Sequence, residues 1–234
     1  MGQLLETRRE GAVSVITLND GKANALSPDM LGQINAALDQ AQADGTVVLL
    51  TGRPGMFSGG FDLNVFKQGG QAPLDMLRAG GETAYRLLAF PAPVVIAVTG
   101  HAIAMGVFLM MGGDVRIGVS DKPAKIWVNE SQIGMTLPYF AIELCRQRLD
   151  PVTFNRALIT AEPHTPEQAV TAGFLDSVAP ADSLLTVALE KATQLSTLSR
   201  DAYVGTKARL RANALQALRA ALDADAKNWG SGKM

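Results

Sequence analysis

Cysteine and histidine are scarce in this sequence. Among 234 residues there is one cysteine, Cys145, and there are two histidines, His101 and His164. A single cysteine cannot form a disulfide within the chain, and no Cys/His spacing resembles a zinc site. The composition therefore favours a reduced, intracellular protein without a metal.

An excess of charge of one sign is also lacking. Lys and Arg number 21 against 22 Asp and Glu, which leaves a net charge of −1. Without a basic excess the chain has little with which to neutralise a phosphate backbone, so nucleic acid is not an expected partner.

The longest uncharged stretch, Leu87 to Gly113, is long enough to span a bilayer of about 30 Å. Prolines and glycines interrupt it, however, and a β-branched half before Gly100 differs from a Met/Leu/Phe half after it. We therefore predict a buried strand, a glycine-bearing turn and a buried helix, and no membrane association. The N-terminus is too highly charged for a signal peptide, which predicts a cytoplasmic protein.

Hydrophobic periodicity predicts strands that alternate with helices. Helix starts with a capping residue followed by proline occur at Ser27-Pro28 and Thr165-Pro166. Continuous apolar runs are typical of parallel strands covered on both faces. Strands are predicted at 12–18, 47–51, 93–98, 115–119 and 125–128. We expect an α/β core over residues 1–180 and a helical C-terminal region over residues 181–234.

Three segments at strand ends could carry chemistry. The first, Thr51 to Leu63, is rich in glycine but matches neither phosphate-loop nor dinucleotide-binding spacing. It is either a plain tight turn or a loop that turns the Phe61 N–H toward a ligand. The second, Gly100 to Leu109, leaves a strand and enters an apolar helix, so an N–H near Met105 is free to bind negative charge. His101 in this segment is expected to be structural.

The third segment, Lys125 to Gly134, places an acid at the end of a short strand. Asn129 and Gln132 have the spacing of a helix cap, which puts Glu130 in the first helical turn. Such a glutamate can merely complement the helix dipole. Its apolar neighbours favour an acid/base role instead, because desolvation raises the pKa of a carboxyl and suits it to exchanging protons near neutral pH.

These residues together resemble the crotonase (enoyl-CoA hydratase/isomerase) superfamily, from about residue 3 to residue 230. The stretches in the family's order are Lys22 to Leu26, Phe57 to Leu63, Gly100 to Gly106 and Thr160 to Gly173. The resemblance implies a spiral of repeated ββα units, and trimerisation through the C-terminal helical region into a homotrimer or hexamer. It also implies an acyl-CoA thioester as substrate, with no cofactor other than the CoA that the substrate carries.

The same resemblance assigns the site residues. Two N–H groups, of Phe61 and Met105, would hold the thioester oxygen, and Glu130 would be the acid/base. The substrate-binding residues would be Lys22, Ala23, Ala25, Ser58, Gly59, Gly60, Asp62, Leu63 and Phe108.

Two departures from the family pattern bear on the reaction. Enoyl-CoA hydratases use two glutamates, and the first of these falls at Phe108 here. The segment Val128 to Gly134 instead resembles that of Δ3,Δ2-enoyl-CoA isomerases, which keep one glutamate. The family's usual glycines are also absent at Ala104 and Met105.

We therefore expect an isomerase with Glu130 as the proton shuttle. A hydratase or another lyase is the first alternative, and it would need a second acid, such as Asp62. A CoA-binding protein without catalytic activity is the second.

Overall fold

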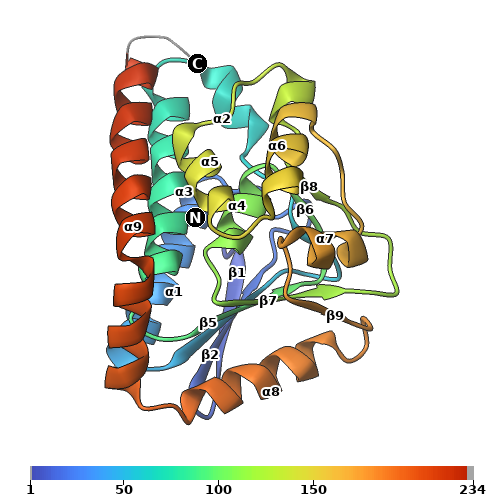
Figure 1. Ribbon diagram of the computed structural model, residues 1–234, viewed down its shortest axis with the longest axis vertical. Helices are drawn as coiled ribbons and strands as arrows, with labels where there is room; N and C mark the ends of the chain where they lie inside the picture. The colour runs from blue at the N-terminus through green and yellow to red at the C-terminus, as the bar shows by residue number, and fades with distance from the viewer. Residues whose placement is uncertain (1, 231–234) are drawn as a thin grey trace.

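The computed structural model describes residues 2–230 and consists of two sheets surrounded by helices (Figure 1). The first sheet has six strands, in the order β1-β2-β3-β5-β7-β9. They are β1 (Leu5–Glu10), β2 (Val13–Leu18), β3 (Val47–Thr51), β5 (Val94–Val98), β7 (Val115–Val119) and β9 (Ser177–Ala179). The second sheet has three strands: β4 (Gly55–Ser58), β6 (Gly100–Ile103) and β8 (Ile126–Trp127).

The helices follow the strand pairs. They are α1 (Pro28–Asp44), α2 (Leu63–Gln68), α3 (Gln71–Ala89), α4 (Met105–Met111), a 3₁₀ helix η1 (Glu130–Ile133), α5 (Tyr139–Arg146), α6 (Pro151–Thr160), α7 (Pro166–Ala172), α8 (Leu184–Ser196) and α9 (Arg200–Gly230).

The chain repeats a ββα unit. Strands β3, β5 and β7 pair in parallel in the first sheet, and each is followed by a strand of the second sheet and then by a helix. The predicted α/β fold of repeated ββα units is thus confirmed.

Both faces of the large sheet are covered. One face, which includes Ile16, Leu50 and Ile96, contributes to the main core with helices α1, α3 and α4. The other face packs against Leu184, Ala188 and Ala192 of α8, which lies below the sheet in Figure 1. Continuous apolar strands are expected from such double coverage.

The C-terminal region predicted at 181–234 is helical as far as the structure describes it, because α8 and α9 fill residues 184–230 apart from short connections. Helix α9 runs beside α3 in Figure 1 and contacts α5. Residues 231–234 of that region lie outside the described residues. Its boundary at residue 181 and its role in trimerisation stay predictions.

Local signals at the helix ends are confirmed. Ser27 Oγ accepts the Met30 N–H at 3.1 Å, and Gly45 ends α1 with a positive φ of 67°. Thr165 caps α7 as predicted and forms a capping box with Gln168. Among the described residues, no helix is long and apolar enough to span a membrane.

The predicted turn after Gly100 is wrong, because residues Gly100–Ile103 form strand β6. A Cβ on Gly100 would lie 1.9 Å from the carbonyl carbon of Gly55, so the backbones of β4 and β6 meet where no side chain fits. Glycine therefore marks close strand packing here rather than a turn. Strand β4 lies inside the predicted glycine-rich loop and was missed because its first residue, Gly55, and the following Gly59 and Gly60 signal a turn.

Candidate active site

A cavity of about 140 Å³ lies between α2, η1, α5 and the start of α4. Its walls are mostly apolar. They comprise Gly59, Phe61, Leu63, Phe66, Leu77, Ile103, Ala104, Phe108, Asn129, Glu130, Ile133, Met135, Pro138 and Phe140. Among these described residues, Glu130 is the one with an ionisable side chain.

Glu130 begins η1, separated by two residues from the end of strand β8, and is 6% exposed. Its Oε2 atom is buried and has no hydrogen-bond partner within the described part of the chain. Burial raises the pKa of Glu130 from 4.5 to about 7, and a hydrogen bond from its own backbone N–H offsets only part of that rise. A carboxyl with this pKa can both take and return a proton near neutral pH.

Asn129 precedes Glu130 and does not play the capping role that its spacing predicts. Its side chain makes no capping hydrogen bond at the start of η1. Instead Asn129 lines the cavity, and its Oδ1 atom is buried and without a partner among residues 2–230. Two neighbouring residues of the cavity lining thus each have a buried side-chain oxygen without a hydrogen-bond partner among residues 2–230.

Two backbone N–H groups lie where the first and second segments meet. Gly60 has a φ of 94°, and a Cβ there would lie 3.0 Å from the Ala104 Cβ and 3.4 Å from the Met105 nitrogen. Within residues 2–230, the N–H groups of Phe61 and Met105 donate to no other backbone group. The two segments therefore lie close together, and both N–H groups are unused by the described backbone. That they serve one oxygen, as in an oxyanion hole, stays a prediction.

Ala104 has the backbone conformation that glycine would adopt without cost. Its φ is 50° and its ψ is −123°, directly before the first residue of α4. A non-glycine residue with such angles stores strain, and strain of this kind concentrates at functional sites. Alanine thus occupies a position at which glycine would be unstrained.

Loop residues Asp20 to Leu26 support the first segment from behind. The Gly59 N–H donates to the Ala23 carbonyl at 2.8 Å, and the Leu26 N–H donates to the Gly60 carbonyl at 2.8 Å. These bonds bring predicted residues Ala23, Gly59 and Gly60 together beside the cavity. Lys22 is exposed, and the Arg53 guanidinium donates to its carbonyl.

Two residues that hold this loop escaped sequence reasoning, Asp20 and Asn24. The Asp20 carboxylate accepts the N–H groups of Lys22, Asn24 and Ala25 at 2.7–2.9 Å. Partial burial raises the pKa of Asp20, but these N–H donors outweigh it, and the pKa lies below its usual value. Asn24 Nδ2 donates to three backbone carbonyls, those of Leu18, Met56 and Phe57. The clue in the sequence is the dipeptide Asp20-Gly21, which is typical of a turn.

We expect Asn24→Ala to loosen the loop. Asn24 is fully buried with a φ of 49°, and its loss leaves buried carbonyls without a donor. The free energy of unfolding should fall by roughly 2–3 kcal/mol, as measured by urea denaturation. The control Asn64→Ala, at an exposed position of α2, should change it by less than about 0.5 kcal/mol. Equal stability of Asn24→Ala and the wild type would contradict this role.

The remaining predicted site residues divide into three groups. Leu63 and Phe108 line the cavity with Gly59, Phe61 and Glu130. Ser58 and Asp62 face the backbone instead: Ser58 Oγ donates to the Asn24 carbonyl at 2.8 Å, and Asp62 caps α2 by accepting the Asn64 N–H at 2.9 Å. Lys22, Ala23, Ala25, Gly60 and Met105 lie outside the cavity lining.

The lone cysteine is not a candidate nucleophile. Cys145 is fully buried on α5. Burial first, and the nearby negative charge of Glu130 second, raise the pKa of the Cys145 thiol. A thiol that stays protonated is unreactive. Among residues 2–230, no group of three or more His, Cys, Asp or Glu side chains is placed to hold a metal ion.

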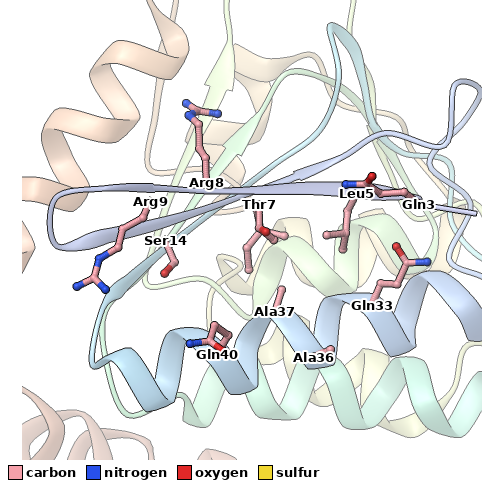
Figure 2. Close-up of a pocket in the computed structure, with 11 residues that line it drawn as sticks. Gln3, Leu5, Thr7, Arg8, Arg9, Ser14, Gln33, Ala36, Ala37 and Gln40 are labelled. Carbon is pink, nitrogen blue, oxygen red and sulfur yellow. The ribbon is translucent and has the colours of Figure 1, made fainter.

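A second, larger groove of about 490 Å³ lies between the β1–β2 hairpin and α1. Figure 2 shows Leu5, Thr7 and Ser14 pointing toward α1 and Arg8 pointing away from it. Arg8 pairs with Glu10 at 3.0 Å and Arg9 pairs with Asp44 at 3.7 Å. Its two charged lining residues are thus already paired, and the groove offers no acid/base group.

The pattern of the enoyl-CoA hydratase/isomerase family matches residues 8–232. A solved enoyl-CoA isomerase from Mycobacterium tuberculosis is 42% identical, with 97% of this chain and 99% of that chain covered and a TM-score of 0.92. A solved enoyl-CoA hydratase from Mycobacterium marinum is 41% identical, with 94% of this chain and 97% of that chain covered and a TM-score of 0.90.

Human mitochondrial enoyl-CoA delta isomerase 1 is 27% identical over 234 residues, which cover 97% of this chain and 77% of the human protein. Relatives with isomerase names and relatives with hydratase names are thus both similar over nearly the full chain. The resemblance to the crotonase superfamily is confirmed. Since the family pattern spans almost all of the sequence and the folds agree, the protein belongs to the enoyl-CoA hydratase/isomerase family.

Proposed function

We propose that the protein is an enoyl-CoA isomerase that moves a 3-enoyl double bond to the trans-2 position. The observation that carries this proposal is the single carboxyl of the cavity. Glu130 is the one ionisable side chain among the described lining residues. Phe108, which the family resemblance places where a hydratase has its first glutamate, lines the same cavity. Hydration requires a water to be activated while a proton is delivered, whereas a double-bond shift requires only one group that takes and returns a proton.

The proposed steps use residues already described. Ionised Glu130 removes a proton from C2, and the electrons of the C2–H bond move into the conjugated system as a dienolate. The N–H groups of Phe61 and Met105 stabilise the negative oxygen, each by roughly 3 kcal/mol at the transition state. Protonated Glu130 then returns the proton at C4, which restores the thioester carbonyl with the double bond at C2. The reaction therefore consumes no oxidant and adds no water.

The hydratase alternative meets an obstacle in this geometry. The second acid that it would need, Asp62, caps α2 and does not line the cavity. Some similar proteins have hydratase names, so hydration is one of the outcomes that the test below distinguishes.

The test is to incubate the protein separately with 3-enoyl-CoA and with trans-2-enoyl-CoA and to follow each product. We expect 3-enoyl-CoA to be isomerised much faster than the 2-enoyl thioester is hydrated. Hydration as the main reaction would favour the hydratase alternative. Binding of both thioesters without turnover of either would favour a CoA-binding protein without catalysis.

The raised pKa of Glu130 predicts a pH dependence. Because the ionised carboxylate is the base and its pKa is about 7, kcat/KM should fall about tenfold per unit as the pH drops below 7. The measurement is kcat/KM for 3-enoyl-CoA between pH 5 and pH 9. A flat profile from pH 5 to pH 8 would show that another group, or an unperturbed carboxyl, is the base.

A further inference from the structure

Two adjacent glycines, Gly80 and Gly81, lie buried in the middle of helix α3, which has 19 residues. Glycine is among the poorest residues for a helix interior, because it loses the most backbone freedom on folding. A buried pair of them in a long helix therefore calls for a packing reason. The side chains packed against each glycine give that reason.

The space at Gly80 is occupied by the two residues proposed to form the oxyanion hole. A Cβ on Gly80 would lie 2.5 Å from Cζ and 2.6 Å from Cε1 of Phe61, and 3.3 Å from Sδ of Met105. Real Cβ atoms do not come this close to an aromatic carbon, so an alanine at 80 would displace the ring. Gly81 faces different neighbours, Leu222 of α9 and Phe140.

The Phe61 ring is packed on one side and borders the cavity on another. It packs edge-on against Phe66 at 6.3 Å between ring centroids, and it forms part of the cavity wall. The backbone of the same residue is fixed on the other side by the bridge between Phe61 and Leu26. A ring displaced by an alanine at 80 would therefore turn into the cavity or move the Phe61 backbone relative to Met105.

We propose that Gly80 is a positioning residue for the oxyanion hole. Its missing side chain leaves the room in α3 that seats the Phe61 ring and the Met105 thioether, and this seating holds the two N–H groups beside one another. The inference rests on the proposed function, because it assumes that these donors stabilise the dienolate oxygen.

The experiment measures kcat and KM for 3-enoyl-CoA in Gly80→Ala and in the matched control Gly32→Ala. Gly32 is an exposed glycine of helix α1, and a Cβ there would have no neighbour within 4 Å. We expect Gly80→Ala to lower kcat by roughly 10- to 100-fold, the cost of misplacing a catalytic donor, with KM changed less than about threefold. Gly32→Ala should match the wild type in both constants.

Repeating the substitution in a second variant distinguishes a misplaced oxyanion hole from a general loss of structure. Phe61→Leu removes the ring atoms that an alanine at 80 would meet, so adding Gly80→Ala to Phe61→Leu should lower kcat by less than about twofold further. An unchanged kcat in Gly80→Ala, or an equal loss in both backgrounds, would overturn the positioning role while the isomerase proposal stands. A wild type that turns over no 3-enoyl-CoA would overturn the proposed function and this inference with it.

Discussion

The variant Glu130→Gln should retain the fold and bind acyl-CoA but lose roughly 10²- to 10⁴-fold in kcat, the contribution of a positioned acid/base. Glutamine keeps the shape of the side chain but cannot accept and return a proton. The loss should be this large because, among the described residues, no second carboxyl lines the cavity to take over the role. The measurement is steady-state turnover of 3-enoyl-CoA, and near-normal turnover would remove Glu130 from the mechanism.

The same substitution should raise stability at alkaline pH. Unfolded glutamate ionises near pH 4.5, whereas buried Glu130 ionises near pH 7. The stability contributed by the neutral carboxyl is therefore complete below pH 4.5 and is lost as the pH rises through 7. At pH 8 the free energy of unfolding of Glu130→Gln should exceed that of the wild type by up to about 3 kcal/mol, and near pH 4 the difference should vanish.

Phe108→Glu should shift the enzyme from isomerisation toward hydration. Phe108 is 2% exposed, lines the cavity and packs edge-on against Phe140 at 6.0 Å between ring centroids. Its ring is expected to exclude the nucleophilic water, so that proton return outcompetes hydration. A glutamate there supplies the second carboxyl in the cavity that holds Glu130, and the ratio of 3-hydroxyacyl-CoA to trans-2-enoyl-CoA should rise by about tenfold or more.

The control for this prediction is Phe108→Leu, which opens space without adding an acid and should keep the preference for isomerisation. Both variants are compared with the wild type by the amounts of the two products under the same conditions, after unfolding curves show that each is folded. An unchanged product ratio in a folded Phe108→Glu would mean that this position does not decide the reaction.

The parts of the fold that sequence predicts are those with strong local signals. Apolar runs at 47–51 and 94–98 are strands because both faces of the sheet are covered, and Ser27 and Thr165 start helices because their hydroxyls cap them. Strand β1 was missed because five of its six residues are exposed and it shows no apolar alternation. Strands β4 and β6 were missed because glycine, which usually signals a turn, here permits two backbones to touch.

The residues of the candidate site also differ in whether a local signal in the sequence marks them. The acid Glu130 and the donors Phe61 and Met105 were predicted because strand ends and family motifs mark them. The supporting residues depend on tertiary contacts that no local pattern encodes: Asn24 reaches carbonyls more than thirty residues away, and Gly80 matters only because the Phe61 ring occupies the place of its side chain. The expected Asn129 cap was wrong because spacing does not reveal which way a side chain turns.

The most direct test of the account is the conversion of 3-enoyl-CoA by the wild type in D₂O, with the product analysed at low conversion by mass spectrometry and NMR. If one buried carboxyl carries the proton from C2 to C4 in a cavity closed to water, the main product is trans-2-enoyl-CoA, and part of it carries the substrate's own hydrogen at C4. A main product of 3-hydroxyacyl-CoA, or deuterium at C4 in every product molecule, would contradict the proposal that Glu130 acts as a shielded proton shuttle.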